Sequence, residues 1–576
     1  MTNIDLAKIP MNPLPFTVRH PQKIIPVSQV TQQHRTLRSH CQLVPAHHPF
    51  LQTSETAAAT NNNWRNLGFQ KRLQKQRLPR SSTRCACAMQ GSASIPGDLT
   101  GKTVVVVGLA SSGRAAAALA AARGAQLVVG MDVDPKCPPL HEDARMRGVH
   151  PDRLRTELGP HDPTSMLRAD LVVVSPGVPV ALPQLEAAMR AGVPALSELA
   201  FAAESLPPDL PIAAVTGTNG KSTVATFTGQ LLEGCGVKTF VGGNLGTPLS
   251  EAALEFVQVP QNAPPPYQAA VVEASSYQLQ LAGGFHPTAA VIINLTPDHL
   301  ERHGSMRAYG EAKCAIFKNM QKGQLAVVGS DNPLLAALRD ECGTQADSAM
   351  LGQLPGCVVE ARASPPRVVV QLPWDPAQRV VQLDRLQVVG RHNVDNAGAA
   401  ALMALALGLP LVTERGLERA MSLLHPPPHR MQLLGATGGV LWIDDSKATN
   451  VESTAAGVRG LDSPAVVLLG GQAKKDPAGA GLGFGRLAPL MHRHRAVVTF
   501  GASGPAIFDE LRAAGCPCPL ACCSTSSMRD AVRHAREFVL DGDAILLSPG
   551  CASFDEFDNF MHRGRVFAEM FQDAKN

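Results

Sequence analysis

Residues 213–224 read AAVTGTNGKSTV, and this stretch decides the fold. A short apolar run opens into two glycines, a lysine and two hydroxyl residues, and a segment compatible with a helix follows. This layout is typical of a turn between a strand and a helix whose backbone N–H groups surround a phosphate. The strict form of this loop has a further glycine where Val215 stands, so the sequence predicts a shortened relative of it.

In such a loop Lys221 would meet the terminal phosphates, and the hydroxyl of Ser222 or Thr223 would reach Mg²⁺. The alternative is a glycine-rich turn with an exposed lysine. Outward from the loop, residues 241–246 predict a second glycine-rich turn, which carries the amide of Asn244.

Two further apolar runs, at 269–273 and 290–295, predict buried parallel strands with polar ends. Glu273 lies at the end of the first run, and an acid at a strand end is a natural second ligand of the metal. Past the second lies His299, a usable ligand or proton carrier that is by itself compatible with a polar surface. The predicted helix 305–318 contains Lys313, which alone would be assigned to a solvated face.

The carboxyl-terminal part repeats the strand pattern after a proline-rich hinge candidate at 425–430. Apolar runs at 440–443, 465–469, 496–500 and 544–547 predict a further doubly wound sheet. Lys, Asp, Ser and Thr gather at the strand ends, which suits an anionic substrate.

The amino-terminal globular part begins with a β-branched strand at 103–107 and a turn that contains Gly108 and Gly113. Asp132 ends the next strand, as in folds that hold a ribose or a base there. Ala110 replaces the middle glycine of the dinucleotide fingerprint. A nucleotide diphosphate, NAD and a plain turn without ligand therefore all stay open.

Residues 1–90 contain 12 Lys and Arg but only two acids, and no apolar period runs through them. This acid-poor composition is typical of an organelle transit peptide, which we place at 1–95. A basic tail that binds acidic surfaces is the alternative.

Removing the ten net positive charges of this segment from the formal +4 leaves the remaining chain near −6, which disfavours nucleic-acid binding. No apolar run reaches the roughly 18 residues of a membrane span, so we expect no membrane insertion. The 13 cysteines fit a reducing compartment, and the group 516–523 lacks paired Cys-x-x-Cys knuckles for zinc.

Six motifs in order resemble those of the Mur ligase family, and the likeness covers about residues 100–570. They are TGTNGKST at 216–223, EASS at 273–276, NLTPDH at 294–299, EAK at 311–313, GRHNVDN at 390–396 and DSKATN at 445–450. Within the family, the last motif and SPGCASFDEF at 548–557 look most like enzymes that add D-glutamate to UDP-N-acetylmuramoyl-L-alanine.

The resemblance implies an α/β fold of three domains and an ATP-dependent peptide synthase of peptidoglycan precursor synthesis and cell wall biogenesis. The domains would be a Rossmann-like UDP-sugar domain at 96–205, a central P-loop ATP domain at 206–424 and a Rossmann-like amino-acid domain at 425–576. ATP would convert the substrate carboxylate into an acyl phosphate, which the amine of D-glutamate would attack. We expect a monomer in the plastid stroma, with the cytoplasm as second choice.

The resemblance also implies roles for individual residues. The catalytic set would be Lys221, Glu273, His299 and Lys313, with Ser222 and Glu273 on one Mg²⁺ and His299 and Lys313 on a second. Lys313 would carry a carbamate formed from CO₂. ATP would contact Thr218, Asn219, Gly220, Lys221, Ser222, Thr223, Asn393, Asn396, Arg430 and Asp445. The other two substrates would contact Ser111, Ser112, Asp132, Gly177, Asn244, Ser275, Lys447, Thr449, Lys474, Ser553 and Phe554.

Two alternatives stay open. One is a catalytically idle plastid homologue with a structural or regulatory role. It would have no physical reason to retain such a set of charged ligands. The other is a folate-type polyglutamate ligase, but that relative typically has glycine after the loop lysine, where Ser222 stands here.

Overall fold

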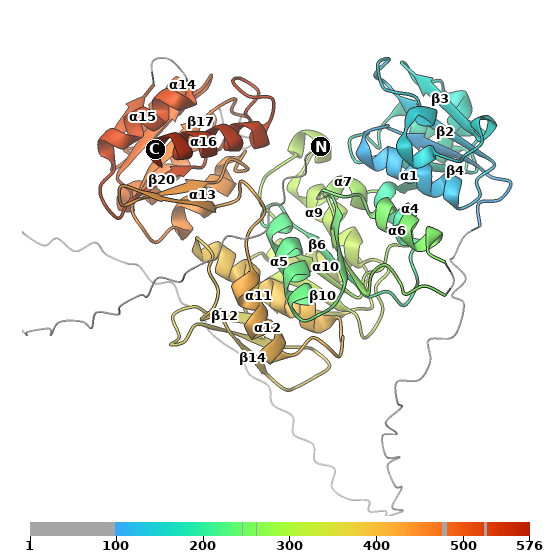
Figure 1. Cartoon of the computed structure of the whole chain (residues 1–576), viewed down its shortest axis with the longest axis horizontal. Helices are drawn as coiled ribbons and strands as arrows, with labels where there is room; N and C mark the ends of the chain where they lie inside the picture. The colour runs from blue at the N-terminus through green and yellow to red at the C-terminus, as the bar shows by residue number, and fades with distance from the viewer. Residues whose placement is uncertain (1–97, 245, 261, 475–480, 524–526, 576) are drawn as a thin grey trace, which may run out of the picture. The chain divides into compact units, whose positions relative to one another are not determined.

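The computed structural model describes residues 98–244, 246–260, 262–474, 481–523 and 527–575. Within these ranges the chain forms three sheets with helices packed on them, coloured from blue to red along the chain in Figure 1. This confirms the predicted three-part α/β fold, whereas the predicted domain boundaries stay predictions. All the described residues belong to one compact unit, and every contact below lies inside it. The predicted transit segment lies outside the described residues.

The first sheet is parallel throughout, with strand order β3-β2-β1-β4-β5. Val104 and Val106 face α1, whereas Val105 and Val107 face α2 and α3, so both faces are buried. The elements are β1 Thr103–Val107, α1 Ser111–Ala122, β2 Leu127–Asp132, β3 Leu154–Leu158, α2 Pro163–Leu167, β4 Leu171–Val174, α3 Pro183–Arg190, β5 Ala195–Ser197 and α4 Glu198–Ala203.

The central sheet has nine strands in the order β14-β13-β12-β11-β10-β9-β6-β8-β7. Only the pairs β12–β13 and β13–β14 of this described sheet are antiparallel. The strands are β6 Ile212–Thr216, β7 Thr239–Gly243, β8 Ala269–Glu273, β9 Ala289–Ile292, β10 Leu325–Gly329, β11 Asp347–Leu351, β12 Gly356–Glu360, β13 Arg367–Gln371 and β14 Arg379–Gln382.

Alternate residues of these strands enter two separate cores. Ala214 and Ile292 pack toward α6, α9 and α10, whereas Val215 and Val291 pack toward α5, α11 and α12. The helices are α5 Lys221–Gly234, α6 Leu249–Gln258, α7 Ser276–Leu279, α8 Leu300–His303, α9 Met306–Cys314, α10 Pro333–Glu341, α11 Arg391–Ala406 and α12 Glu414–Ala420.

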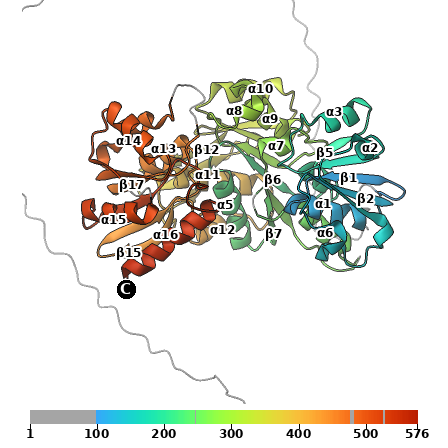
Figure 2. The same cartoon turned by 90° about the horizontal axis from the view of Figure 1, so that it is seen from above.

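The first and central sheets share a core. Helices α1 and α4 pack on α6; Figure 1 shows the three helices side by side, and Figure 2 shows α1 next to α6. Val104 and Phe201 belong to the same buried cluster as Leu249 and Phe256 of α6. This continuous apolar core fixes the first sheet against the central one.

The third sheet has the order β15-β16-β20-β17-β18-β19, and only its β15–β16 pair is antiparallel. One face packs on α13, α14 and the 3₁₀ helix η6, and the other on α15 and α16. The elements are β15 Gln432–Thr437, β16 Val440–Asp444, α13 Val451–Gly460, β17 Ala465–Gly470, η6 Phe484–Arg493, β18 Ala496–Phe500, α14 Gly504–Ala513, β19 Leu520–Cys522, α15 Met528–Phe538, β20 Ala544–Leu547 and α16 Phe560–Lys575.

Two local predictions are wrong. The predicted glycine-rich turn at 241–246 begins inside strand β7, because Gly242 and Gly243 pair with Val272 and Glu273 of β8. The predicted strand 290–295 ends at Ile292, since the chain turns there toward the loop after β6. No helix in the described part of the chain is both long enough and apolar enough to cross a membrane.

Candidate active site

The turn between β6 and α5 requires glycine at two positions. Gly217 has φ 147° and Gly220, the N-cap of α5, has φ 85°. A Cβ atom at Gly217 would lie 3.3 Å from the backbone N of Asn294, and one at Gly220 would lie 3.1 Å from Asn396 Oδ1. The turn is therefore both left-handed and tightly packed, as the sequence predicts for a phosphate loop.

Asn294 holds this turn in place. Its Oδ1 accepts hydrogen bonds from the backbone N–H groups of Thr218 at 3.1 Å and Asn219 at 2.9 Å, and its Nδ2 donates to Asn219 O at 3.0 Å. No role for Asn294 was predicted from sequence. The available signal was its place just after β9, the strand next to β6.

A polar cluster lies directly beside the turn. Ser222 Oγ donates to Glu273 Oε2 at 2.6 Å, and Arg430 Nη2 donates to Ser222 Oγ at 2.8 Å. Asn244 Nδ2 donates to the other oxygen of Glu273, Oε1, at 2.9 Å. The structure thus brings together a hydroxyl, a carboxylate, an amide and a guanidinium from four separate segments. Thr223 is buried beside them, and it is Ser222 that contacts the acid.

The charges in this cluster shift one another's pKa values. Burial alone would raise the pKa of Glu273, but Lys221 and the hydrogen bonds from Ser222 and Asn244 outweigh it and lower that pKa. Burial lowers the pKa of Lys221, partly offset by Glu273. Lys221 Nζ donates to Thr218 O at 2.9 Å within the turn. Glu273 is therefore held as an anion next to the phosphate loop.

Lys313 is not on a solvated face. Its side chain is 1% exposed, and its Nζ donates to Gly217 O at 2.7 Å and lies 4.4 Å from the ring centre of Tyr309. Burial, followed by the charge of Lys221, lowers the pKa of Lys313 well below its usual range. These surroundings favour a neutral amine.

His299 is the N-cap of α8, in a left-handed conformation with φ 54°, and its ring centre lies 5.1 Å from that of Tyr277. Asp298 precedes it, and Lys474 Nζ lies 3.7 Å from Asp298 Oδ1. The Lys474 side chain thereby reaches the strand ends of the central sheet. Lys475, its neighbour, lies outside the described residues.

A cavity of about 720 Å³ collects most of these groups. Its lining comes from the central sheet and from the third sheet, with Lys447 and Thr449 facing the phosphate loop. The predicted site residues that line it are Thr218, Asn219, Lys221, Ser222, Asn244, Glu273, His299, Arg430, Lys447 and Thr449. Thr449 also lines a small neighbouring cavity together with His299 and Lys474.

Three family models match this chain. The Mur ligase MurD-like N-terminal domain matches residues 102–197, the Mur ligase middle domain 215–404 and the glutamate ligase domain of Mur ligases 429–551. The chain belongs to the Mur ligase family. Curated relatives named UDP-N-acetylmuramoylalanine–D-glutamate ligase include one from Anaeromyxobacter dehalogenans, which is 38% identical over 82% of this chain and 98% of its own length. One from Myxococcus xanthus is 37% identical over 82% of this chain and 99% of its own.

Solved structures agree with this fold. The MurF ligase from Thermotoga maritima in complex with ADP has 17% sequence identity and a TM-score of 0.51 over 83% of this chain and 96% of its own. A MurF structure from Acinetobacter baumannii has 16% identity and a TM-score of 0.50 over 82% and 91%. At these sequence identities, the two structures show only that this chain shares their fold.

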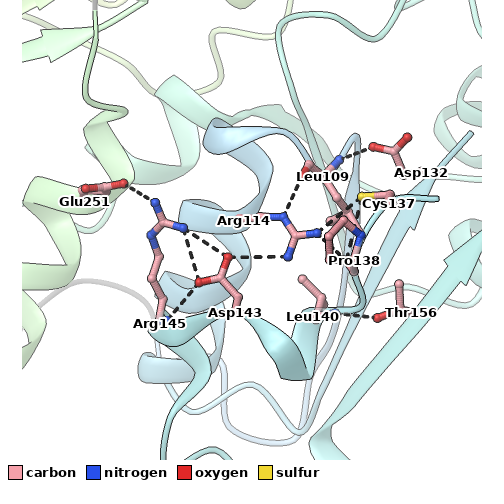
Figure 3. Close-up of polar contacts among 10 residues, drawn as sticks. All are labelled: Leu109, Arg114, Asp132, Cys137, Pro138, Leu140, Asp143, Arg145, Thr156 and Glu251. Carbon is pink, nitrogen blue, oxygen red and sulfur yellow. Dashed lines mark hydrogen bonds and ion pairs between the residues drawn. The ribbon is translucent and has the colours of Figure 1, made fainter. Parts of the chain in front are cut away.

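A second cavity, of about 480 Å³, lies at the carboxyl ends of the first sheet of this Mur ligase. Ser112, Asp132, Gly177 and Asn244 line it, whereas Ser111 is exposed at the start of α1. Figure 3 shows how its glycine-rich turn is held. Leu109 N donates to Asp132 Oδ2 at 2.7 Å, and Arg114 Nε donates to Leu109 O at 2.9 Å. Asp134 N donates to the other oxygen, Oδ1, at 3.0 Å, so both oxygens of Asp132 accept hydrogen bonds from the backbone.

Several predicted residues of the Mur ligase line neither of the two large cavities. Asn396 Nδ2 donates to Asn393 Oδ1 at 3.2 Å, beneath Gly220. Ser275 caps α7, accepting from Gln278 N at 3.3 Å. Ser553 is buried, and Phe554 is 70% exposed. Neither lines either large cavity among the described residues.

Asp445 is also buried, and it accepts hydrogen bonds from Ser548 Oγ at 2.7 Å and Met431 N at 3.2 Å. Burial raises the pKa of Asp445 to about 7. Because Met431 has φ 46°, this carboxyl supports a strained segment beside Arg430. Contact of Asp445 with a nucleotide stays a prediction.

Sequence reasoning missed other residues that line the larger cavity, among them Asp298, Ser453 and Phe560. Ser453 Oγ donates to Asn219 Oδ1 at 2.6 Å, and Lys447 Nζ lies 3.8 Å from the ring centre of Phe560. Ser453 and Phe560 are far from the loop in sequence, so no local spacing signals them.

The cysteine group 516–523 forms no metal cluster in the structure. Among the described residues, no three or more His, Cys, Asp or Glu side chains are placed to hold a metal ion. Cys516 Sγ and Cys518 Sγ lie 3.8 Å apart beside the apolar core of the third sheet.

Proposed function

We propose that this Mur ligase joins D-glutamate to UDP-N-acetylmuramoyl-L-alanine at the expense of ATP, in peptidoglycan precursor synthesis. The curated relatives bear that name and align with this chain over nearly their whole length. The observation that carries the proposal is the single cavity in which the phosphate loop faces Lys447 and Thr449. A phosphate donor and an anionic acceptor would meet there.

In the proposed reaction the γ-phosphoryl group of ATP passes to the substrate carboxylate, giving an acyl phosphate and ADP. The amine of D-glutamate then attacks the acyl carbon, loses a proton and expels phosphate. The chain would act mainly by alignment and by neutralising charge. Lys221 and the N–H groups of the α5 N-terminus would hold the phosphates, and Lys447 would attract a carboxylate.

The residues beside the loop fit Mg²⁺. Ser222 Oγ and Glu273 Oε2 are hard oxygen donors 2.6 Å apart. Mg²⁺ commonly takes one or two protein oxygens and fills its other positions with phosphates and water. Bound there, the ion would neutralise phosphate charge. We assign Ser222 and Glu273 to a first ion, and His299 with carbamylated Lys313 to a second.

The carbamate on Lys313 is part of this proposal. An amine attacks CO₂ only in its neutral form, and the proton it loses goes to solvent. The buried amine of Lys313 has the lowered pKa that this reaction needs. The product is an anionic oxygen donor. The positive charge of Lys221, which lowers the pKa of the Lys313 amine, would stabilise this anion.

The test measures phosphate release by the purified chain lacking residues 1–95. UDP-N-acetylmuramoyl-L-alanine, ATP and Mg²⁺ are supplied with D-Glu, L-Glu, L-Lys or diaminopimelate in turn. Of the four amino acids, we expect only D-Glu to cause phosphate release. If release with D-Glu does not exceed the background, the proposed activity is refuted and the idle homologue is favoured. Release with a folate substrate and L-Glu would instead point to the folate-type ligase.

We further propose import into a plastid and action as a monomer. The basic, acid-poor composition of residues 1–90 supports import, and the family models begin only at residue 102. A fluorescent fusion of residues 1–95 is expected in plastids, and a cytosolic signal would refute import. Light scattering during size-exclusion chromatography would detect a dimer and so contradict the monomer.

A further inference from the structure

Arg302 connects two parts of the molecule that the proposed reaction uses separately. It lies on α8, three residues after His299. Its Nη2 donates to Val178 O at 3.1 Å and to Gln280 Oε1 at 3.2 Å, and its Nη1 donates to Pro176 O at 3.4 Å. One side chain therefore ties the central sheet to the loop after β4 of the first sheet.

The same guanidinium stacks on an aromatic ring. The Cζ atom of Arg302 lies 3.8 Å from the ring centre of Tyr277, and that ring in turn contacts His299 and His303. His303 Nε2 lies 3.0 Å from Ser276 Oγ. The half-buried Tyr277 thus contacts three side chains of the segment 299–303, which couples the position of Arg302 to that of His299.

The loop that Arg302 holds forms a wall of the 480 Å³ cavity. Pro176, Gly177 and Val178 line that cavity beside Gly108. A Cβ atom at Gly108 would lie 2.9 Å from Val178 Cγ2, and Ser175 Oγ donates to Gly108 O at 2.7 Å. Because these contacts are close, a shift of the loop would be passed to the glycine-rich turn.

We propose that Arg302 is a positioning residue that couples the cavity of the first sheet to His299. Through it, a ligand that orders the loop 176–178 also orders α8, and the converse holds. This inference rests on the proposed function, since it takes a UDP-sugar for the first cavity and a metal–nucleotide for the second. The two ligands would then bind with positive cooperativity, which must be reciprocal.

Arg302→Lys is the informative variant. Lysine keeps the charge, but it cannot stack as a planar group or donate to three acceptors in a fork. Isothermal titration with UDP-N-acetylmuramoyl-L-alanine and with ADP·Mg²⁺, each alone and in the presence of the other, gives two affinities and one coupling factor. Arg307→Lys is the control, because Arg307 lies on the adjacent α9 and pairs with Glu311 and Glu341.

We expect Arg302→Lys to weaken binding of the UDP-sugar alone by about tenfold, on the scale of a lost charge-assisted hydrogen bond. The affinity for ADP·Mg²⁺ alone should stay within about twofold, and the coupling factor should fall to about 1. Arg307→Lys should match wild type in all three quantities. If Arg302 had a purely structural role, Arg302→Lys would instead have a lower melting temperature and would bind both ligands more weakly, to the same extent.

Unchanged UDP-sugar affinity and coupling in Arg302→Lys would overturn the inference, as would a wild-type chain without coupling. Uniform loss of both affinities with a lowered melting temperature would also overturn it. The proposed function fails separately. A wild type that binds the UDP-sugar but releases no phosphate with D-Glu refutes the ligase activity, and the coupling is still measured.

Discussion

Replacing Asn294 by alanine tests whether this side chain sets the shape of the phosphate loop. The substitution removes three hydrogen bonds, to Thr218 N, Asn219 N and Asn219 O. At about 1 kcal/mol each they contribute about 3 kcal/mol. Thr218 N keeps a 3.1 Å bond to the backbone O of residue 294, so the expected loss is about 2 kcal/mol.

Because the lost bonds lie in the loop, most of this free energy should appear in nucleotide binding. A loss of 2 kcal/mol corresponds to about 30-fold in affinity. The assay measures the affinity for ADP·Mg²⁺ by titration and the KM for ATP from phosphate release. Melting temperature is recorded alongside, since a multidomain chain gives no single free energy of unfolding.

Asn319→Ala is the matched control. Asn319 Nδ2 donates to Gly283 O at 2.8 Å and Phe285 O at 3.1 Å, away from the loop. It should lower the melting temperature without changing nucleotide affinity. If Asn294→Ala folds and binds ADP·Mg²⁺ within about twofold of wild type, the loop does not depend on this brace and the reasoning fails.

Three other substitutions test the site. Lys313→Ala should abolish phosphate release; full activity in this variant would remove the carbamate from the account. Burial, followed by Arg430, lowers the pKa of Lys447 to about 8, so its charge is present below and lost above that pH. The KM for D-Glu should rise above pH 8, and Lys447→Arg should abolish this rise; an unchanged pH profile in that variant contradicts the role of Lys447. Gly220→Ala forces a side chain into φ 85° and should weaken nucleotide binding about tenfold, from a strain of about 1–2 kcal/mol. Gly236→Ala has the same strain at φ 87° with nothing within 4 Å, so equal nucleotide loss in both would disprove a local effect.

Most buried strands could be predicted from sequence, because continuous β-branched runs such as 103–107 admit few other structures. Strands β10–β14 were not predicted. In β13 and β14, apolar residues are flanked by Arg and Gln, which obscures the period-2 signal. The glycines at 217 and 220 correctly predicted the phosphate-loop turn. The glycine-rich turn predicted at 241–246 was wrong in part, because Gly242 and Gly243 belong to strand β7.

Sequence by itself determined the elements whose cause is local: the strands, the positive-φ glycines of the loop, and the order of the motifs. Only the tertiary structure decided which side chains meet. Arg430 reaches Ser222 across 208 residues and Ser453 reaches Asn219 across 234, because parallel strands of two sheets end at the same cavity. Burial likewise changed Lys313 from an expected surface residue into a neutral-amine candidate. Burial depends on every element packed around a side chain, so no local pattern reports it.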